Sequence, residues 1–130
     1  MDWFRADQSA GTVYAAVSGR MGGPLARANT TYPYITFRVI SSSPDWAVGV
    51  NFEKCRIQFT VHTQNDADGM DAELIASKLR NRFDWANLTF DGSEYTTFSM
   101  MPVVSAGLMP LEDDRSQYVQ DYMYTVQQSA

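Results

Sequence analysis

The chain has 130 residues, the length of a single globular domain; 45% of them are apolar and 19% are charged. Fifteen acidic residues against ten basic ones give a net charge of −5, which disfavours sequence-independent binding to a nucleic-acid backbone. No run of about eighteen apolar residues is present, and the first residues do not resemble a signal peptide. The single cysteine, Cys55, excludes an internal disulfide and is typical of a reducing compartment. We therefore expect one soluble domain over residues 1–130, with no membrane span.

The first quarter of the chain predicts a short helix followed by a loop. Residues 1–20 contain apolar side chains at helical spacing, namely Val13, Tyr14 and Val17. Residues 21–33 are rich in turn-forming residues and predict a loop. Pro33 suits the first position of an extended segment, so a strand is expected to follow it.

Two segments alternate between apolar and polar residues with the period of a strand, Tyr34–Ser42 and Glu53–Thr63. Their predicted core faces consist of Ile35, Phe37 and Val39 in the first strand and Cys55, Ile57, Phe59 and Val61 in the second. The connector 43–52 contains proline, aspartate and glycine and is longer than a tight hairpin turn. We expect an antiparallel hairpin with a protruding loop.

Residues 67–83 predict an amphipathic helix. One face carries Ala72, Ile75, Ala76, Leu79 and Phe83. Asp66 or Asp68 is expected to cap the amino-terminal end of the helix. Met70 and Leu74 lie on another face, which a helix packed on one sheet leaves uncovered. We expect Phe59 of the second strand to pack against Leu79 and Phe83 of this helix, together with Ile57.

The carboxyl-terminal third predicts a second hairpin, a connector and a last strand. Leu88–Phe90 and Tyr95–Met101 flank an Asp91-Gly92 turn, and Gln117–Gln127 reads as the final strand. The connector 102–116 between them is long and unusually apolar. The order of elements predicts the α+β class, with a mainly antiparallel sheet and helices packed on one face.

No motif for catalysis, cofactor binding or metal binding is found. His62 is the only histidine, so one chain cannot assemble a histidine-based metal cluster or a Ser-His-Asp relay, and its place in the alternation predicts a solvated side chain facing away from the core. The acidic stretch 66–73 suggests a calcium loop, but its glycine is the fourth residue and Ser77 stands at position twelve. Helix capping explains the same residues. We expect no enzyme activity and no cofactor.

Arginine and apolar residues point to protein–protein contacts. Eight of the ten basic residues are arginine, which interfaces favour over lysine. Arg38, Arg56 and Arg80 are expected to pair with carboxylates of neighbouring subunits. The predicted interface residues are those that one small core leaves uncovered: Trp46, Val48, Met70, Leu74, Val103, Val104, Leu108, Met109 and Leu111.

The order of elements resembles a family of virion proteins. Tyr32-Pro33-Tyr34-Ile35-Thr36-Phe37 enters a strand, and the alternating strand Cys55–Thr63 ends at Asn65-Asp66 just before the helix. A late hairpin, an acidic connector and a tyrosine-rich last strand come after the helix. From about residue 12 to residue 127, this arrangement resembles the tail terminator proteins (tail-completion, tail-to-head joining) of long-tailed bacteriophages.

The resemblance implies a homo-hexameric ring on the head-proximal end of the tail tube, which ends tube polymerisation and joins the tail to the head. Its implied partners are other copies of the chain, the tail tube protein and a head-closure or neck protein, in a virion assembled in the bacterial cytoplasm. DNA would pass through the channel without sequence-specific binding, and the acidic net charge suits such a passage. The alternatives are another neck protein (head-closure or head–tail adaptor) and a non-viral subunit that binds one protein partner.

Overall fold

The computed structural model describes residues 11–23, 31–47, 50–66, 68–84, 95–97, 100–112 and 114–128. Within them, residues 41–47, 50–53, 95–97, 104–106 and 125–128 are described by their backbone alone. The elements in chain order are α2 (Val13–Ala16), β1 (Met21–Gly22), β2 (Tyr34–Ala47), β3 (Val50–Thr63), α3 (Met70–Phe83), β4 (Tyr95–Thr97), β5 (Met101–Pro110) and β6 (Ser116–Gln128). None of the described helices is long and apolar enough to cross a membrane.

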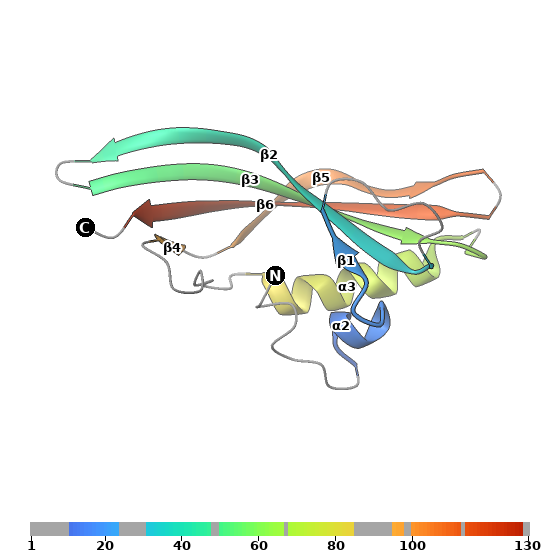
Figure 1. Ribbon diagram of the computed structural model, residues 1–130. Helices are drawn as coiled ribbons and strands as arrows, with labels where there is room; N and C mark the ends of the chain where they lie inside the picture. Colours follow the sequence, from blue (N-terminus) through green and yellow to red (C-terminus); the bar gives the residue numbers. More distant parts are fainter. Residues whose placement is uncertain are drawn as a thin grey trace.

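The described strands form one sheet, and the two described helices, α2 and α3, lie on the same side of it (Figure 1). The strand order is β1-β2-β3-β6-β4, and β5 also pairs with β6. Only the short β1–β2 pair is parallel among the described strands. β5 pairs with the first part of β6 and β4 with its last residues, so the two strands lie one after the other along the same edge. The predicted α+β class, with helices on one face of a mainly antiparallel sheet, is confirmed.

Alternation along β3 builds the floor of the core. Cys55, Ile57, Phe59 and Val61 are all buried, as predicted, and the residues between them are half-buried. On β2, Ile35 is buried and Phe37 is half-buried, but Val39 is 53% exposed. The prediction that Val39 belongs to the core is wrong, because α3 packs on β3 and β6 and leaves this part of the edge strand uncovered.

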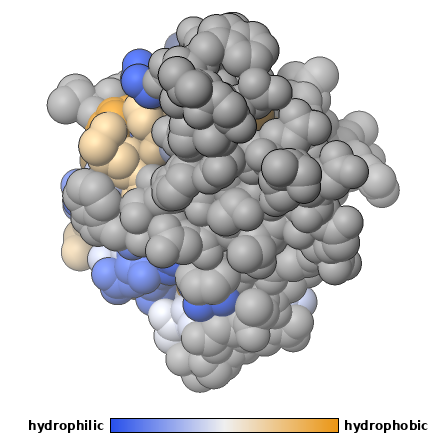
Figure 2. All heavy atoms as spheres, turned by 90° about the vertical axis from the view of Figure 1, so that its left-hand side faces the viewer, coloured by the Kyte–Doolittle hydropathy of each residue, from blue (hydrophilic) through white to orange (hydrophobic). Residues whose placement is uncertain are grey.

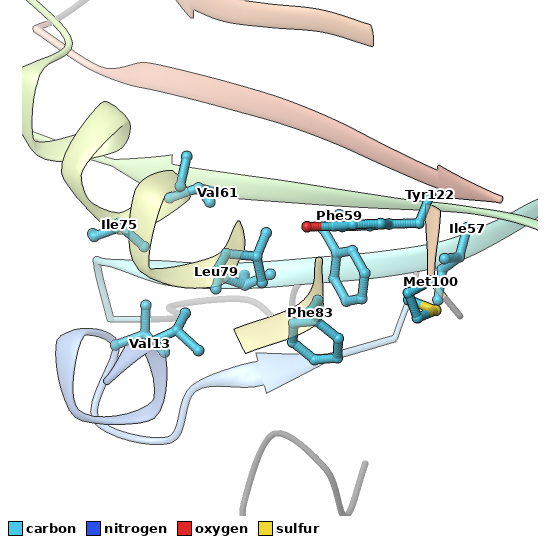
Figure 3. Packing of buried hydrophobic residues seen from close by; sticks show 12 residues of the cluster. Val13, Ile57, Phe59, Val61, Ile75, Leu79, Phe83, Met100 and Tyr122 are labelled. Carbon is cyan, nitrogen blue, oxygen red and sulfur yellow. The ribbon is translucent and has the colours of Figure 1, made fainter. Parts of the chain in front are cut away.

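Helix α3 covers the floor with the face that its sequence predicts. Ala72, Ile75, Ala76, Leu79 and Phe83 are its buried residues. The ring centroids of Phe59 and Phe83 lie 4.9 Å apart, and Tyr122 of β6 meets Phe59 edge-on at 5.9 Å. Figure 3 shows these rings beside Leu79 and Ile57. The expected packing of Ile57, Phe59, Leu79 and Phe83 is confirmed. Val13 and Val17 of the α2 region close the other end of the cluster.

The predicted loop over residues 43–52 is instead part of a long hairpin. The β2–β3 ladder continues from Ser42 opposite Cys55 to Ala47 opposite Val50. Pro44 suggests a turn, but β1 pairs with β2 only at Ile35 and Thr36. Among the described strands Pro44 therefore lies on an open edge, where its missing N–H costs no ladder hydrogen bond. The prediction of a protruding loop is therefore wrong.

The prediction of a connector over residues 102–116 is also wrong, because most of this segment forms β5. The ladder with β6 runs from Met101 opposite Met123 to Pro110 opposite Ser116. Its register shifts between Val103 and Gly107, and Gly107 has a positive φ of 70°. This irregularity breaks the alternation that identifies a strand. Only residues 111–115 are left between β5 and β6.

The remaining boundaries differ in smaller ways. The predicted loop 21–33 contains the two-residue strand β1. Of the second predicted hairpin, residues 88–94 lie outside the described residues, and β4 (95–97) pairs with β6. The last strand is confirmed and extends one residue beyond its prediction at each end.

Replacing Phe59 or Leu79 with alanine is expected to lower the free energy of unfolding by about 2–5 kcal/mol, because each change empties a fully buried site. Leu74→Ala is the control, since this leucine lies on the same helix with its side chain 56% exposed, and it is expected to cost about 0.5 kcal/mol or less. Urea denaturation followed by circular dichroism measures both. A Phe59→Ala loss no larger than that of Leu74→Ala would contradict the assigned core.

Candidate assembly surfaces

The structure places most of the predicted interface residues on α3, on β5 and in the turn after β5. Met70 and Leu74 are 67% and 56% exposed on the outer side of α3, and Met109 and Leu111 are also exposed at the end of β5. Val103 is half-buried in β5. Trp46 and Val104 lie in β2 and β5 with undescribed side chains, and Val48 lies outside the described residues.

Leu108 has a contact inside the chain. A Cβ added to Gly69 would lie 2.6 Å from Leu108 Cδ1, so the leucine side chain lies directly over the glycine that precedes α3. Gly69 also has a φ of 77°, which favours glycine. Leu108 thus holds β5 against the start of α3, and a change there would disturb the fold as well as a surface.

A buried aspartate fixes where α3 begins. Asp66 Oδ1 accepts a hydrogen bond from the Asp71 N–H at 3.1 Å, and Oδ2 accepts one from the Ala72 N–H at 3.0 Å. The Thr63 hydroxyl donates to the same Oδ2 at 2.8 Å. Asp68 Oδ1 accepts from the Met70 N–H, so both predicted capping residues bind the first turn.

The backbone of Asp66 extends this contact to β6. The Ser116 hydroxyl donates to the Asp66 carbonyl oxygen at 2.7 Å, and the Asp66 N–H donates to the Asp114 carbonyl oxygen at 2.7 Å. One residue therefore ties together the end of β3, the start of α3 and the turn into β6. The acidic stretch acts as a cap in this structure, and no three potential metal ligands are grouped among the described residues.

The charge of Asp66 is stabilised despite its burial. Burial alone would raise the pKa of this carboxyl group, but the hydrogen bonds from Asp71, Thr63 and Ala72 lower the pKa below its usual value. The ionised form is therefore the form that holds the helix start.

Helix α3 presents its uncovered side as a ridge between two grooves. One groove, of about 430 Å³, lies toward α2 and the Tyr32-Pro33 segment and is lined by Leu74, Ile75 and Lys78 of the helix. The other, of about 270 Å³, lies toward Tyr118 of β6 and is lined by polar helix residues such as Glu73 and Arg80. The Met70–Leu74 ridge thus projects where a second protein surface can pack around it.

We call the sheet face opposite the helices the outer face. It is polar, and its side chains contact one another through hydrogen bonds and ring stacking. His62 lies on it as predicted, yet it is half-buried and not simply solvated. Its ring stacks on Tyr34 at 4.5 Å, and its two nitrogens lie 3.0 Å from Thr36 Oγ1 and 3.3 Å from Gln117 Nε2. Burial lowers the pKa of His62, which favours the neutral ring.

Two of the three arginines expected to pair with neighbouring subunits pair within the chain. Arg56 binds the buried Asp121 across β3 and β6 at 2.6 Å, and Arg80 lies 3.7 Å from Asp84. Arg38 is exposed and makes one long hydrogen bond, 3.4 Å, to Gln58. The intramolecular partners of Arg56 and Arg80 correct the prediction for these two residues.

Sequence reasoning missed three exposed apolar residues, Val39, Ile40 and Met101. Met101 stood in a predicted hairpin, and Ile40 lies at the irregularity between Val39 and Ser41 in the β2–β3 ladder. Figure 2 shows apolar surface in the upper part of the molecule, where the sheet lies, and a separate hydrophilic area lower down. The sheet therefore offers uncovered apolar surface in addition to the helix ridge.

Comparison with protein-family models and with curated proteins finds no match. Among solved structures, a chain of a particle described as the virion of a native gene transfer agent superposes with a TM-score of 0.74. The two chains share a fold. Their sequences are 12% identical, and the match covers 99% of this chain and 90% of the virion chain. The likeness therefore extends over the whole domain and is not confined to the β2–β3 hairpin or to one helix.

Replacing Asp66 with asparagine is expected to lower the free energy of unfolding at pH 7 by about 1–3 kcal/mol, because the amide cannot accept all three hydrogen bonds. A lowered pKa in the folded state means that the carboxylate stabilises the fold above its ordinary pKa of about 4 and that this stability is lost as the pH falls through the folded-state pKa. The wild-type protein should thus lose more stability between pH 7 and pH 3 than Asp66→Asn does.

Urea denaturation across this pH range measures the difference. Asp71→Asn is the matched control, because Asp71 is exposed in the first turn of the same helix and the change keeps the backbone N–H that donates to Asp66. Stability curves for the wild-type protein and Asp66→Asn that coincide from pH 7 to pH 3 would show that Asp66 does not fix the helix start.

Proposed function

We propose that the chain is a structural protein of a tailed virion that forms a homo-hexameric ring at the head-proximal end of the tail tube. There it ends polymerisation of the tube and provides the joint to the head. The observation that carries the proposal is the fold shared with a gene transfer agent virion chain over 99% of this sequence. The order of elements resembles that of tail terminator proteins, which narrows the proposed role within a virion.

The distribution of exposed surface supports assembly into a ring. A ring is built from heterologous contacts, in which one patch of each subunit meets a different patch of the next. The chain offers two unlike surfaces, the apolar ridge of α3 and the polar outer face of the sheet with its apolar margins. They lie on different sides of the domain, so both can be occupied at once in a head-to-tail arrangement (Figure 1).

The proposed partners are set by this position in the virion. The ring would contact the tail tube protein on one side and a head-closure or other neck protein on the other. DNA would pass through its channel without sequence-specific binding, and a net charge of −5 disfavours adhesion of phosphates to the wall. The chain would act in the virion, after assembly in the host cytoplasm, with no catalytic step and no cofactor.

Deleting the gene from a genome that encodes the particle tests this role. Electron microscopy is expected to show tail tubes of uncontrolled, greater length and filled heads without tails. Supplying the protein in trans is expected to restore normal tail length and the joining of tails to heads. Tails of normal length that fail to join heads would identify a head-closure or adaptor protein instead. Normal particles in the deletion strain would contradict a virion role altogether. Expression of Asp66→Asn tests whether rescue depends on the fold.

A further inference from the structure

The end of the molecule where α3 begins combines exposed apolar side chains with acidic ones. We call this surface the acidic corner; its apolar members are Met70, Leu74 and Leu111, and its exposed acids are Asp68, Asp71, Glu73, Glu112 and Asp114. The hydrogen bond from the Asp66 N–H to the Asp114 carbonyl oxygen holds the turn before β6 against the start of the helix. The two acidic segments therefore belong to one surface, at the right-hand end of Figure 1.

A second surface combines apolar and basic side chains on the outer face of the sheet. Met101, Met123 and Arg56 lie next to one another across β5, β6 and β3 in register. Arg38 and Ile40 extend the surface onto β2, and both are exposed. We call these five residues the outer patch.

The charge of the outer patch is positive. Arg56 is paired with the buried Asp121, so this pair is neutral overall. Arg38 retains its charge without an ion pair among the described side chains. Both surfaces therefore expose apolar side chains. The five exposed acids of the acidic corner outnumber its exposed base, Arg115, so the net charges of the two surfaces are opposite.

We propose that the acidic corner of one copy binds the outer patch of the next copy. This inference rests on the proposed function only for the number of copies in the ring; the contact between two copies is argued from the two surfaces alone. Charge complementarity favours a second copy arranged head to tail, because a two-fold dimer through either patch would place like charges opposite each other. The groove of about 430 Å³ beside Leu74 offers a recess for an exposed methionine or isoleucine of the outer patch. Arg38 would reach the carboxylates of Asp71 and its neighbours.

Cysteine cross-linking of the purified protein tests the contact. Leu74→Cys and Met101→Cys are prepared separately, one with a mass tag, then mixed and oxidised; Cys55 is buried and stays in place. We expect mixed disulfide dimers in large excess over dimers of either variant with itself. Asn81→Cys mixed with Met101→Cys is the control, because Asn81 is exposed on the same helix but lies outside the acidic corner. Mixed dimers no more abundant than in the control would overturn the proposal.

Charge reversal separates specific docking from chance collision. Arg38→Glu in the Met101→Cys chain, or Asp71→Arg in the Leu74→Cys chain, is expected to abolish the excess of mixed dimers, and high salt is expected to reduce it. Combining both reversed chains is expected to restore it. Circular dichroism checks that each variant remains folded, and cross-linking that ignores charge and salt would overturn the proposal. The experiment uses purified protein, so its outcome is independent of the deletion phenotype. The proposed contact can fail while the deletion phenotype supports the proposed function, and the proposed function can fail while cross-linking supports the contact.

Discussion

Packing of Phe59 against Phe83 and Tyr122 is the contact on which the rest of the structure depends. It places α3 across β3 and β6 on one face of the sheet, and it buries the largest side chains of the described core in a single cluster. Because α3 is held there by one apolar face, its opposite side must project outward with Met70 and Leu74. Asp66 adds the second constraint, since its bonds to the first turn set where the helix begins relative to β3 and β6.

In a sheet covered by helices on one face, the side chains of the other face need different partners. Here polar contacts provide them: the stack and hydrogen bonds of His62, and the ion pair between Arg56 and the buried Asp121. These contacts let the outer face remain in water in a single copy. The same face still carries exposed apolar residues at its margins, and Arg38 beside them. A single copy therefore provides polar partners for the outer face, and it leaves exposed apolar residues on α3 and at the margins of the sheet.

The sequence predicts those elements whose residues satisfy one strong periodicity. Helix α3 and strand β3 have uninterrupted patterns, and every core residue expected from them is buried. Strand β5 is hidden because its shifted register at Gly107 and its flanking prolines disrupt the alternation. The length of the β2–β3 hairpin is underestimated because Pro44 marks a turn in most contexts. Only the topology shows that Pro44 lies on an open edge of the described sheet.

The same limit applies to the candidate surfaces. Exposure of Met70 and Leu74 is a consequence of the geometry of one helix and can be predicted locally. The outer patch cannot, because Met101, Met123 and Arg56 become neighbours only when β5, β6 and β3 pair. The intramolecular partner of Arg56 is likewise 65 residues away in the sequence. Residues joined by long-range pairing carry no local signal, so this surface emerges only from the structure.

A cryo-electron microscopy reconstruction of the particles produced by the genome that encodes this chain tests the central claim most directly. We expect a closed ring of copies between the tail tube and the head, in which the ridge of α3 in each copy faces the outer face of the sheet in the next. A chain found elsewhere in the particle, or a ring whose copies meet through other surfaces and leave Met70 and Leu74 in solvent, would contradict it.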